Sequence, residues 1–183
     1  MRLAVRVSAT AAVLAGLLGM VPLATAQSAE AATVSCTGKT LGGTGNLSGS
    51  PVARKLNQKI WTQATIKNET AYAQNGVFYD YEIAAPSNRH TTAPDIWWHV
   101  LGGTWHYMPL TWHAAVKGGS DAYWISGDSG IGNLAAHASR TVQFAILFKS
   151  GSATGSYLGT TWLGSKSCGY TGLGHLDENF AYQ

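Results

Sequence analysis

The sequence predicts an all-β fold, a two-sheet antiparallel sandwich of about seven short strands closed by one disulfide bond. Three observations carry this prediction. Segments in which apolar and polar residues alternate recur roughly every 10–15 residues along the chain. Charged residues make up only 11% of the chain, and 22 glycines can supply the turns between short strands. The two cysteines, Cys36 and Cys168, stand near the two ends of the predicted domain. A closed barrel is the alternative that the same patterns allow.

Residues 1–31 are expected to be a cleaved signal peptide. Two arginines precede an uncharged apolar run at 11–18, and small residues suited to cleavage stand at Ala26 and Ala31. Because this run is shorter than the roughly 20 residues that cross a bilayer, a retained membrane anchor is the weaker interpretation. Lipidation of Cys36 is another alternative, but the residues before it lack the small side chains of such a site. We therefore expect a secreted, extracellular protein with no membrane anchor after cleavage.

Three further segments follow the signal peptide. We expect an irregular amino-terminal segment (32–58), the β-sandwich domain (59–168) and a carboxy-terminal tail (169–183). Within the domain, strands are expected where alternation is clearest, over 59–67, 77–83, 96–101, 104–112, 122–126, 141–149 and 156–163. Asn75-Gly76 is a tight-turn signal, and Gly102-Gly103 supplies the turn of a predicted hairpin, 96–101 with 104–112.

The clearest strands alternate between two faces, and one face of each is mostly apolar. These faces consist of Ile60, Thr62, Ala64 and Ile66, then Val77, Tyr79, Tyr81 and Ile83, then Val142, Phe144, Ile146 and Phe148. Leu147 is out of step with this alternation.

An even count of two cysteines in an exported chain indicates one disulfide, Cys36–Cys168. Such a bond closes a loop of about 130 residues, for which the chain-entropy estimate is about 4–5 kcal/mol. It also requires the two Cα atoms to lie within about 7 Å. Two free thiols or an intermolecular bond are the alternatives.

Several short motifs resemble a known module. They are Asn68-Glu69-Thr70 after a strand, Gly103-Thr104-Trp105 with Met108-Pro109-Leu110, Ser139-Arg140-Thr141-Val142 opening a strand that closes on Phe148, and Gly155 before the final strand. Together they are similar to an uncharacterised immunoglobulin-like β-sandwich module of secreted and surface proteins of actinobacteria. The resemblance implies the fold and the extracellular compartment. Members often carry a wall-anchoring signal or a membrane tail, and neither pattern is visible in this chain.

The charge of the chain argues against two classes of partner. Loss of residues 1–31 removes two arginines and one glutamate, which lowers the formal net charge from +3 to about +2. A charge this small does not favour binding to nucleic acid or to an anionic membrane. We expect no cofactor, and the oligomeric state stays open.

Two patterns suggest catalysis. Gly127-Asp128-Ser129-Gly130 resembles the nucleophile segment of secreted serine proteases, but His137 follows Ser129, against the chain order of that family, and a glycine-rich turn explains the same residues. Asp80 and Glu82 share a strand face about 7 Å apart, within the roughly 5–9.5 Å of glycosidase carboxylate pairs. Two acidic residues on a solvent-facing strand surface, without any catalytic role, would show the same spacing in the sequence.

The histidines do not predict a metal site. His99, His106 and His113 recur every seven residues, which places consecutive members on opposite strand faces. Only a hairpin at Gly102-Gly103 could bring the first two together. Without a nearby cysteine or carboxylate, we expect no metal ligand.

A dense group of aromatic residues is the strongest candidate for binding. Its members are Trp97, Trp98, Trp105, Tyr107, Trp112, Tyr123 and Trp124. Because alternation cannot bury both members of Trp97-Trp98 or Tyr123-Trp124 in one core, one of each pair is expected to face outward or lie under a loop. Exposed rings stack on sugars and also anchor protein interfaces.

We therefore expect a non-catalytic secreted sandwich with a binding or structural role at or near the cell envelope. Its partner would be a cell-wall or extracellular glycan or a surface protein, and glycan binding would use the exposed aromatics. One alternative is a small carbohydrate-active enzyme or serine hydrolase. Another is an inhibitor or effector that presents a loop such as 86–94.

Overall fold

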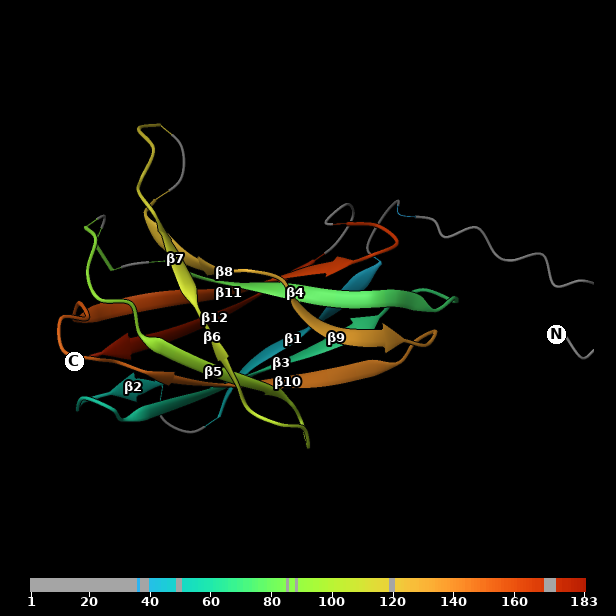
Figure 1. Ribbon diagram of the computed structural model, residues 1–183, viewed down its shortest axis with the longest axis horizontal. Helices are drawn as coiled ribbons and strands as arrows, with labels where there is room; N and C mark the ends of the chain where they lie inside the picture. The colour runs from blue at the N-terminus through green and yellow to red at the C-terminus, as the bar shows by residue number, and fades with distance from the viewer. Residues whose placement is uncertain are drawn as a thin grey trace, which may run out of the picture. The chain divides into compact units, whose positions relative to one another are not determined.

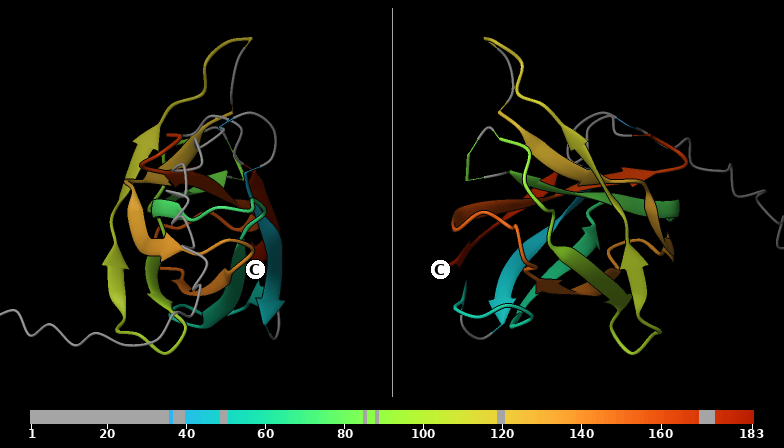
Figure 2. Two further views of the ribbon diagram at one scale, coloured as in Figure 1. Left: turned by 90° about the vertical axis from the view of Figure 1, so that its right-hand side faces the viewer. Right: turned by 60° about the vertical axis from the view of Figure 1, so that its left-hand side comes forward.

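The computed structural model describes residues 36, 40–48, 51–84, 86–87, 89–118, 121–169 and 174–183. These residues contain twelve β-strands and no helix, which confirms the all-β prediction. The strands form two sheets packed face to face (Figures 1 and 2). The expected signal peptide, 1–31, lies outside the described residues. Within those described ranges no helix exists that could span a membrane.

The first sheet, called sheet A, has five strands. In spatial order they are β1 (Leu41–Ser48), β3 (Lys59–Asn68), β10 (Ser139–Leu147), β5 (Asp95–Val100) and β6 (His106–Met108). All neighbours in this sheet pair in the antiparallel sense.

The second sheet, called sheet B, has seven strands. In spatial order they are β2 (Val52–Ala53), β12 (His175–Tyr182), β11 (Gly155–Ser165), β4 (Gln74–Ala84), β8 (Tyr123–Ser126) and β7 (Leu110–His113), with β9 (Ser129–Leu134) also paired to β4. Only the short β2–β12 pairing is parallel.

The core lies between the two sheets and includes the twelve alternating residues of three strands named above, all of which are buried. Each of these strands therefore turns that face inward. Aromatic rings join the layers: Tyr81 of sheet B stacks on Phe144 of sheet A at 4.6 Å between ring centroids. Leu147, the residue out of step, is only partly buried and lies on the outer face of β10.

The disulfide bond Cys36–Cys168 is present, with its Cα atoms 5.4 Å apart. It ties Cys36, which precedes β1 of sheet A, to the turn after β11 of sheet B. The predicted pairing is therefore confirmed.

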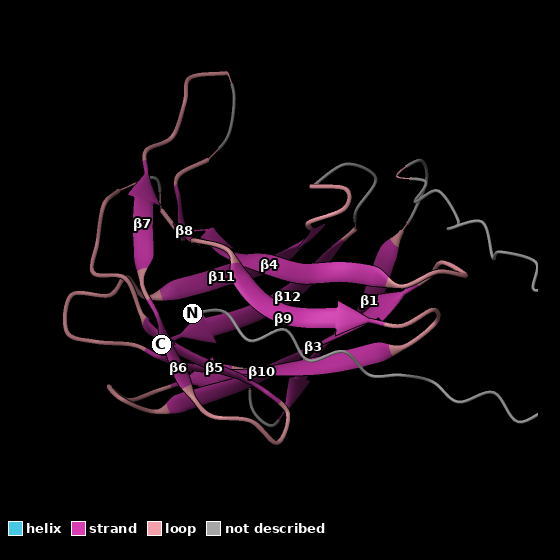
Figure 3. Ribbon diagram, turned by 45° about the vertical axis from the view of Figure 1, so that its right-hand side comes forward, coloured by secondary structure: helices cyan, strands magenta, loops and turns pink. Residues whose placement is uncertain are grey.

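The chain crosses from sheet A to sheet B at Pro109. Figure 3 shows β6 and β7 as successive parts of one path along an edge of the sandwich. The alternation of the sequence predicts a single strand over 104–112. Proline cannot donate a ladder hydrogen bond, so the strand divides there, and its two halves pair with different sheets.

The sandwich has more strands than the predicted seven. β1 and β12 lie in the segments expected to be irregular or a tail, and β9 lies in the expected glycine-rich loop. β1 contains too few apolar residues to alternate, and it is held by its backbone pairing with β3. At Gly43 the backbone comes so close to the carbonyl of Thr65 that any Cβ would collide, which explains a glycine where φ is +152°.

Candidate functional site

A row of outward-facing residues crosses sheet A. The antiparallel register places four residues of neighbouring strands in line: Trp61 on β3, Ala145 on β10, Trp97 on β5 and Tyr107 on β6. The residue before each of the first three is buried in the core, so these three side chains point away from it. Neighbouring strands lie about 4.8 Å apart, which separates the strands of Trp61 and Trp97 by about 10 Å.

A groove of about 380 Å³ lies in this row, and we call it the aromatic groove. It is lined by Lys59, Trp61, Trp97, Trp105, Ala145 and Leu147. The small side chain of Ala145 forms the floor, because the indole rings beside it stand much taller. Trp97 is 42% exposed, so part of its ring remains accessible.

Trp105 closes one side of the aromatic groove. It follows the turn at Gly102-Gly103, and its ring lies 4.0 Å from the ring of His99 and 5.6 Å, edge-on, from that of Trp61. His99 is buried and fixed at both nitrogens. Nδ1 donates to the carbonyl oxygen of Gly103 at 3.2 Å, and Nε2 lies 3.0 Å from Oε1 of Gln143. The groove wall is therefore held by a buried polar contact.

The rim of the aromatic groove is polar. The Tyr107 hydroxyl donates to Oδ1 of Asp95 at 3.2 Å, and the Lys149 ammonium contacts the same oxygen at 2.6 Å. Desolvation, and then the Asp95 carboxylate, raise the pKa of Tyr107, which keeps its hydroxyl a donor. On the β3 side of the groove, Nζ of Lys59 lies 5.4 Å from the ring centroid of Trp61, within cation–π range.

The predicted aromatic residues divide into three groups. Trp97, Trp105 and Tyr107 lie at the aromatic groove or beside it. Trp98, Trp112 and Trp124 pack with the core, and Trp98 lies against Tyr79 at 5.5 Å between ring centroids. Tyr123 lies on the outer face of sheet B, where it stacks on His113.

Four of the six lining residues were not predicted from the sequence: Lys59 and Trp61 on β3, and Ala145 and Leu147 on β10. Those on β3 alternate with its buried face, so the sequence could have placed them outward. What the sequence does not contain is the register that sets β3 beside β10 and β5. Without it, nothing links these residues to the aromatic group further along the chain.

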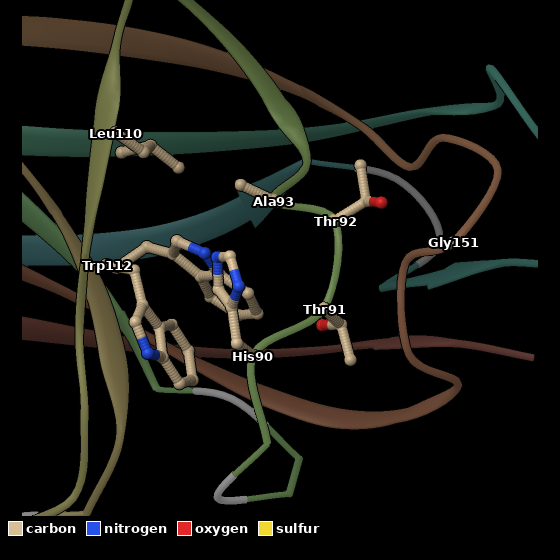
Figure 4. Close-up of a pocket in the computed structure, with 8 residues that line it drawn as sticks. His90, Thr91, Thr92, Ala93, Leu110, Trp112 and Gly151 are labelled. Carbon is tan, nitrogen blue, oxygen red and sulfur yellow. The ribbon is translucent and has the colours of Figure 1, made fainter.

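A second hollow, of about 560 Å³, opens between the loop before β5 and strands β7 and β8 (Figure 4). It is lined by His90, Thr91, Thr92, Ala93, Leu110, Trp112, Trp124 and Gly151. Its aromatic rings cover one another: Trp112 lies 4.8 Å from Trp124 and 5.1 Å from His90. Trp124 is buried, so this larger hollow offers less ring surface to a ligand than the aromatic groove.

The serine hydrolase pattern is not assembled. Ser129 begins β9, whereas His137 follows the end of that strand. The strand between them spans about 16 Å, so the two side chains are far apart. His137 has a positive φ of 57° and donates its backbone N–H to the Thr70 carbonyl, as a turn residue does.

The two carboxylates Asp80 and Glu82 lie on the outer face of sheet B, away from the aromatic groove. Glu82 accepts a hydrogen bond of 3.0 Å from Nε1 of Trp162, its diagonal neighbour on β11. That contact positions the carboxylate along the sheet surface.

The predicted histidine hairpin forms without gathering ligands. His106 pairs with Trp98, so it lies on the opposite face of the hairpin from His99. Among the described residues, no group of three histidine, cysteine or acidic side chains could hold a metal ion.

The chain matches no protein-family model and no curated protein. Several solved structures are similar in fold. AvmM, described as catalysing macrocyclization in alchivemycin A biosynthesis, has a TM-score of 0.55 and 14% identity, over 76% of this chain and 88% of that chain.

Two further structures are more distant. A family IIIa CBD from Clostridium cellulolyticum has a TM-score of 0.36 and 12% identity, over 79% of this chain and 93% of that chain. MyfA, the major subunit of Myf fimbriae from Yersinia enterocolitica, in complex with galactose, has a TM-score of 0.30 and 10% identity, over 78% of this chain and 98% of that chain. At these identities the likeness concerns the fold alone, that of a two-sheet β-sandwich domain.

Proposed function

We propose that the protein is a non-catalytic carbohydrate-binding domain whose binding surface is the aromatic groove. The observation that carries the proposal is the in-line arrangement of Trp61, Ala145 and Trp97 on the outer face of sheet A. Sugar rings present apolar C–H faces, which pack on indole rings, and hydroxyl edges, which bond to polar groups.

The dimensions of the groove favour a chain of sugar rings over a flat protein surface. Two tall indoles stand about 10 Å apart, by strand spacing, on either side of a single alanine. A ring can enter this gap and contact Trp61 or Trp97, whereas a flat partner would rest on the indole edges. Asp95, Lys149 and Tyr107 supply hydrogen-bonding groups at the rim.

The choice of a binding role over catalysis rests on the residues that line the groove. Lys59 is the one ionisable side chain among them. Hydrolysis of a glycosidic bond ordinarily needs two carboxyl groups on either side of that bond. The groove therefore has the surface for holding a glycan and lacks the acid–base pair for cutting it.

An extracellular location at or near the cell envelope is part of the proposal. The Cys36–Cys168 disulfide supports it, because such bonds persist in oxidising compartments. The signal-peptide pattern of residues 1–31 supports it independently.

Retention on insoluble polymers tests the proposal. Chitin, cellulose, peptidoglycan and a polygalacturonate gel are mixed with the wild-type protein, Trp61→Ala, Trp97→Ala and Trp162→Ala. Trp162 is the matched control, since it is 38% exposed on the outer face of sheet B. We expect at least one polymer to retain the wild type and Trp162→Ala equally, and the two groove variants about tenfold less.

Two outcomes would count against glycan binding in the groove. In the first, the wild type stays in the supernatant with all four polymers. In the second, Trp162→Ala loses as much retention as Trp97→Ala, which would place the contact on sheet B or make it non-specific.

A further inference from the structure

The two sheets carry opposite charge. The strands of sheet B, as the structure defines them, contain four acidic residues, of which Asp80, Glu82 and Asp177 face outward, and no lysine or arginine. The strands of sheet A contain two lysines, one arginine and a single acidic residue. The aromatic groove thus lies on the more basic face.

The other cations on or beside the strands of sheet A are already engaged, and Arg140 lies on the side of β10 that faces sheet B. Lys67 pairs with Glu69 at 2.8 Å, and Lys149 pairs with Asp95 at 2.6 Å. The Arg140 guanidinium donates to the backbone carbonyl of Ile131. These contacts leave little positive charge available to a ligand from those three side chains.

Lys59 differs from them. It is exposed, it lines the aromatic groove, and no ion pair between described residues involves it. Its Nζ lies 5.4 Å from the centre of the Trp61 ring. A ligand that stacks on Trp61 would therefore place its substituents beside an ammonium group with no carboxylate partner.

Resting on the proposed glycan binding, we infer that the glycan is acidic, with a carboxylate or sulfate group of one sugar against Lys59 while that sugar stacks on Trp61. When a neutral sugar binds, the ammonium group only exchanges a hydrogen bond to water for one to a sugar hydroxyl group. An anionic group gives it a charge-assisted hydrogen bond, which is stronger than a neutral one. Acidic Asp95 does not oppose this ligand, because Lys149 neutralises it.

The inference can be tested with two polymer backbones, each offered with acidic and with neutral substituents. Beads are coupled to carboxymethylcellulose, cellulose sulfate or hydroxyethylcellulose, and a second set to polygalacturonate or its methyl ester. The variants are Lys59→Met, which removes the charge and keeps the apolar stem, and Lys59→Arg, which keeps the charge. Lys67→Met is the control on the same strand and face.

We expect tighter binding to the acidic polymers than to their neutral counterparts. Lys59→Met should weaken the acidic interaction about three- to fivefold, the effect of one exposed ion pair, and Lys59→Arg should restore it. Lys67→Met should leave it unchanged. Raising the salt concentration should narrow the difference between acidic and neutral polymers. Comparison of binding to carboxymethylcellulose and to cellulose sulfate shows whether a carboxylate or a sulfate group is preferred.

The possible failures are distinguishable. Equal binding of acidic and neutral polymers, unaffected by Lys59→Met, would overturn the charge preference and leave glycan binding in place. Equal losses in Lys59→Met and Lys67→Met would mean general attraction to polyanions and would also overturn it. If no polymer binds here or in the four-polymer assay, both the inference and the proposed function fail.

Discussion

The hydroxyl group of Tyr81 donates a hydrogen bond of 3.4 Å to Oε2 of Glu178 inside the sandwich. Tyr81 belongs to β4, and Glu178 is the one acidic residue on the inward face of β12, where it is 3% exposed. Burial raises the pKa of Glu178 from 4.5 to about 7, and the nearby hydroxyl groups of Thr62 and Tyr81 offset only part of that rise. The core therefore contains a carboxyl group that prefers to be protonated.

This raised pKa predicts how stability depends on pH. Between pH 4.5 and about 7 the folded state holds a proton on Glu178 that the unfolded state has lost, so the free energy of unfolding falls as pH rises. The full effect is on the order of 3 kcal/mol. We expect Glu178→Gln to remove this fall, as measured by urea denaturation at pH 5 and pH 8. Equal pH dependence in the wild type and the variant would show that Glu178 is not the cause.

The adjacent Trp97 and Trp98 should respond oppositely to alanine substitution. Trp98 packs against Tyr79 on the inner face, so Trp98→Ala should lower the free energy of unfolding by roughly 3 kcal/mol. Trp97→Ala, on the outer face, should lower it by less than about 1 kcal/mol. Chemical denaturation measures both values. The reverse order would mean that β5 presents its faces the other way round.

Loss of the disulfide should destabilise the fold without changing its architecture. The bond spans a sequence separation of 132 residues, so replacing Cys36 and Cys168 by serine should lower the free energy of unfolding by about 4 kcal/mol. Circular dichroism should still report β-structure at low temperature. An unchanged denaturation midpoint would contradict a stabilising role for the bond.

Filling the floor of the aromatic groove should block it. Ala145→Leu adds a larger side chain between Trp61 and Trp97, and we expect polymer retention to fall at least tenfold. Circular dichroism should still report the β-fold, because the added atoms displace the groove indoles and leave the core between the sheets in place. Ser156→Leu, which adds a leucine to the outer face of sheet B, is the control for added surface hydrophobicity. Full retention by a folded Ala145→Leu variant would exclude this groove as the ligand site.

Much of the fold could be predicted from the sequence, because a strand with one buried face alternates apolar and polar residues with a period of two. The alternation in 59–67 and 141–149 identified the buried faces of β3 and β10, and the cysteine count gave the disulfide. β1 gave no such signal, since a glycine-rich edge strand is held by backbone pairing. Pro109 divides the predicted strand 104–112, and nothing local to that segment reveals that the second half joins the other sheet.

The candidate site was predictable only in part, for a related reason. Alternation shows that Trp97 and Trp98 face opposite ways, but it does not say which of them faces outward. Long-range pairing decides this, and it also brings Trp61 into line with Trp97 across β10. Trp112 and Trp124 belong to the same dense segment, yet the crossing at Pro109 carries them to the other sheet.

Glycan stacking on the outer face of sheet A can be observed through the indole N–H signals of the isotopically labelled protein in solution NMR. The protein is titrated with soluble fragments of whichever polymer retains it. We predict that the signals of Trp61, Trp97 and Trp105 shift together in proportion to occupancy, while that of Trp162 stays in place. Shifts confined to Trp112, Trp124 or Trp162, with the three groove signals unmoved, would contradict the account.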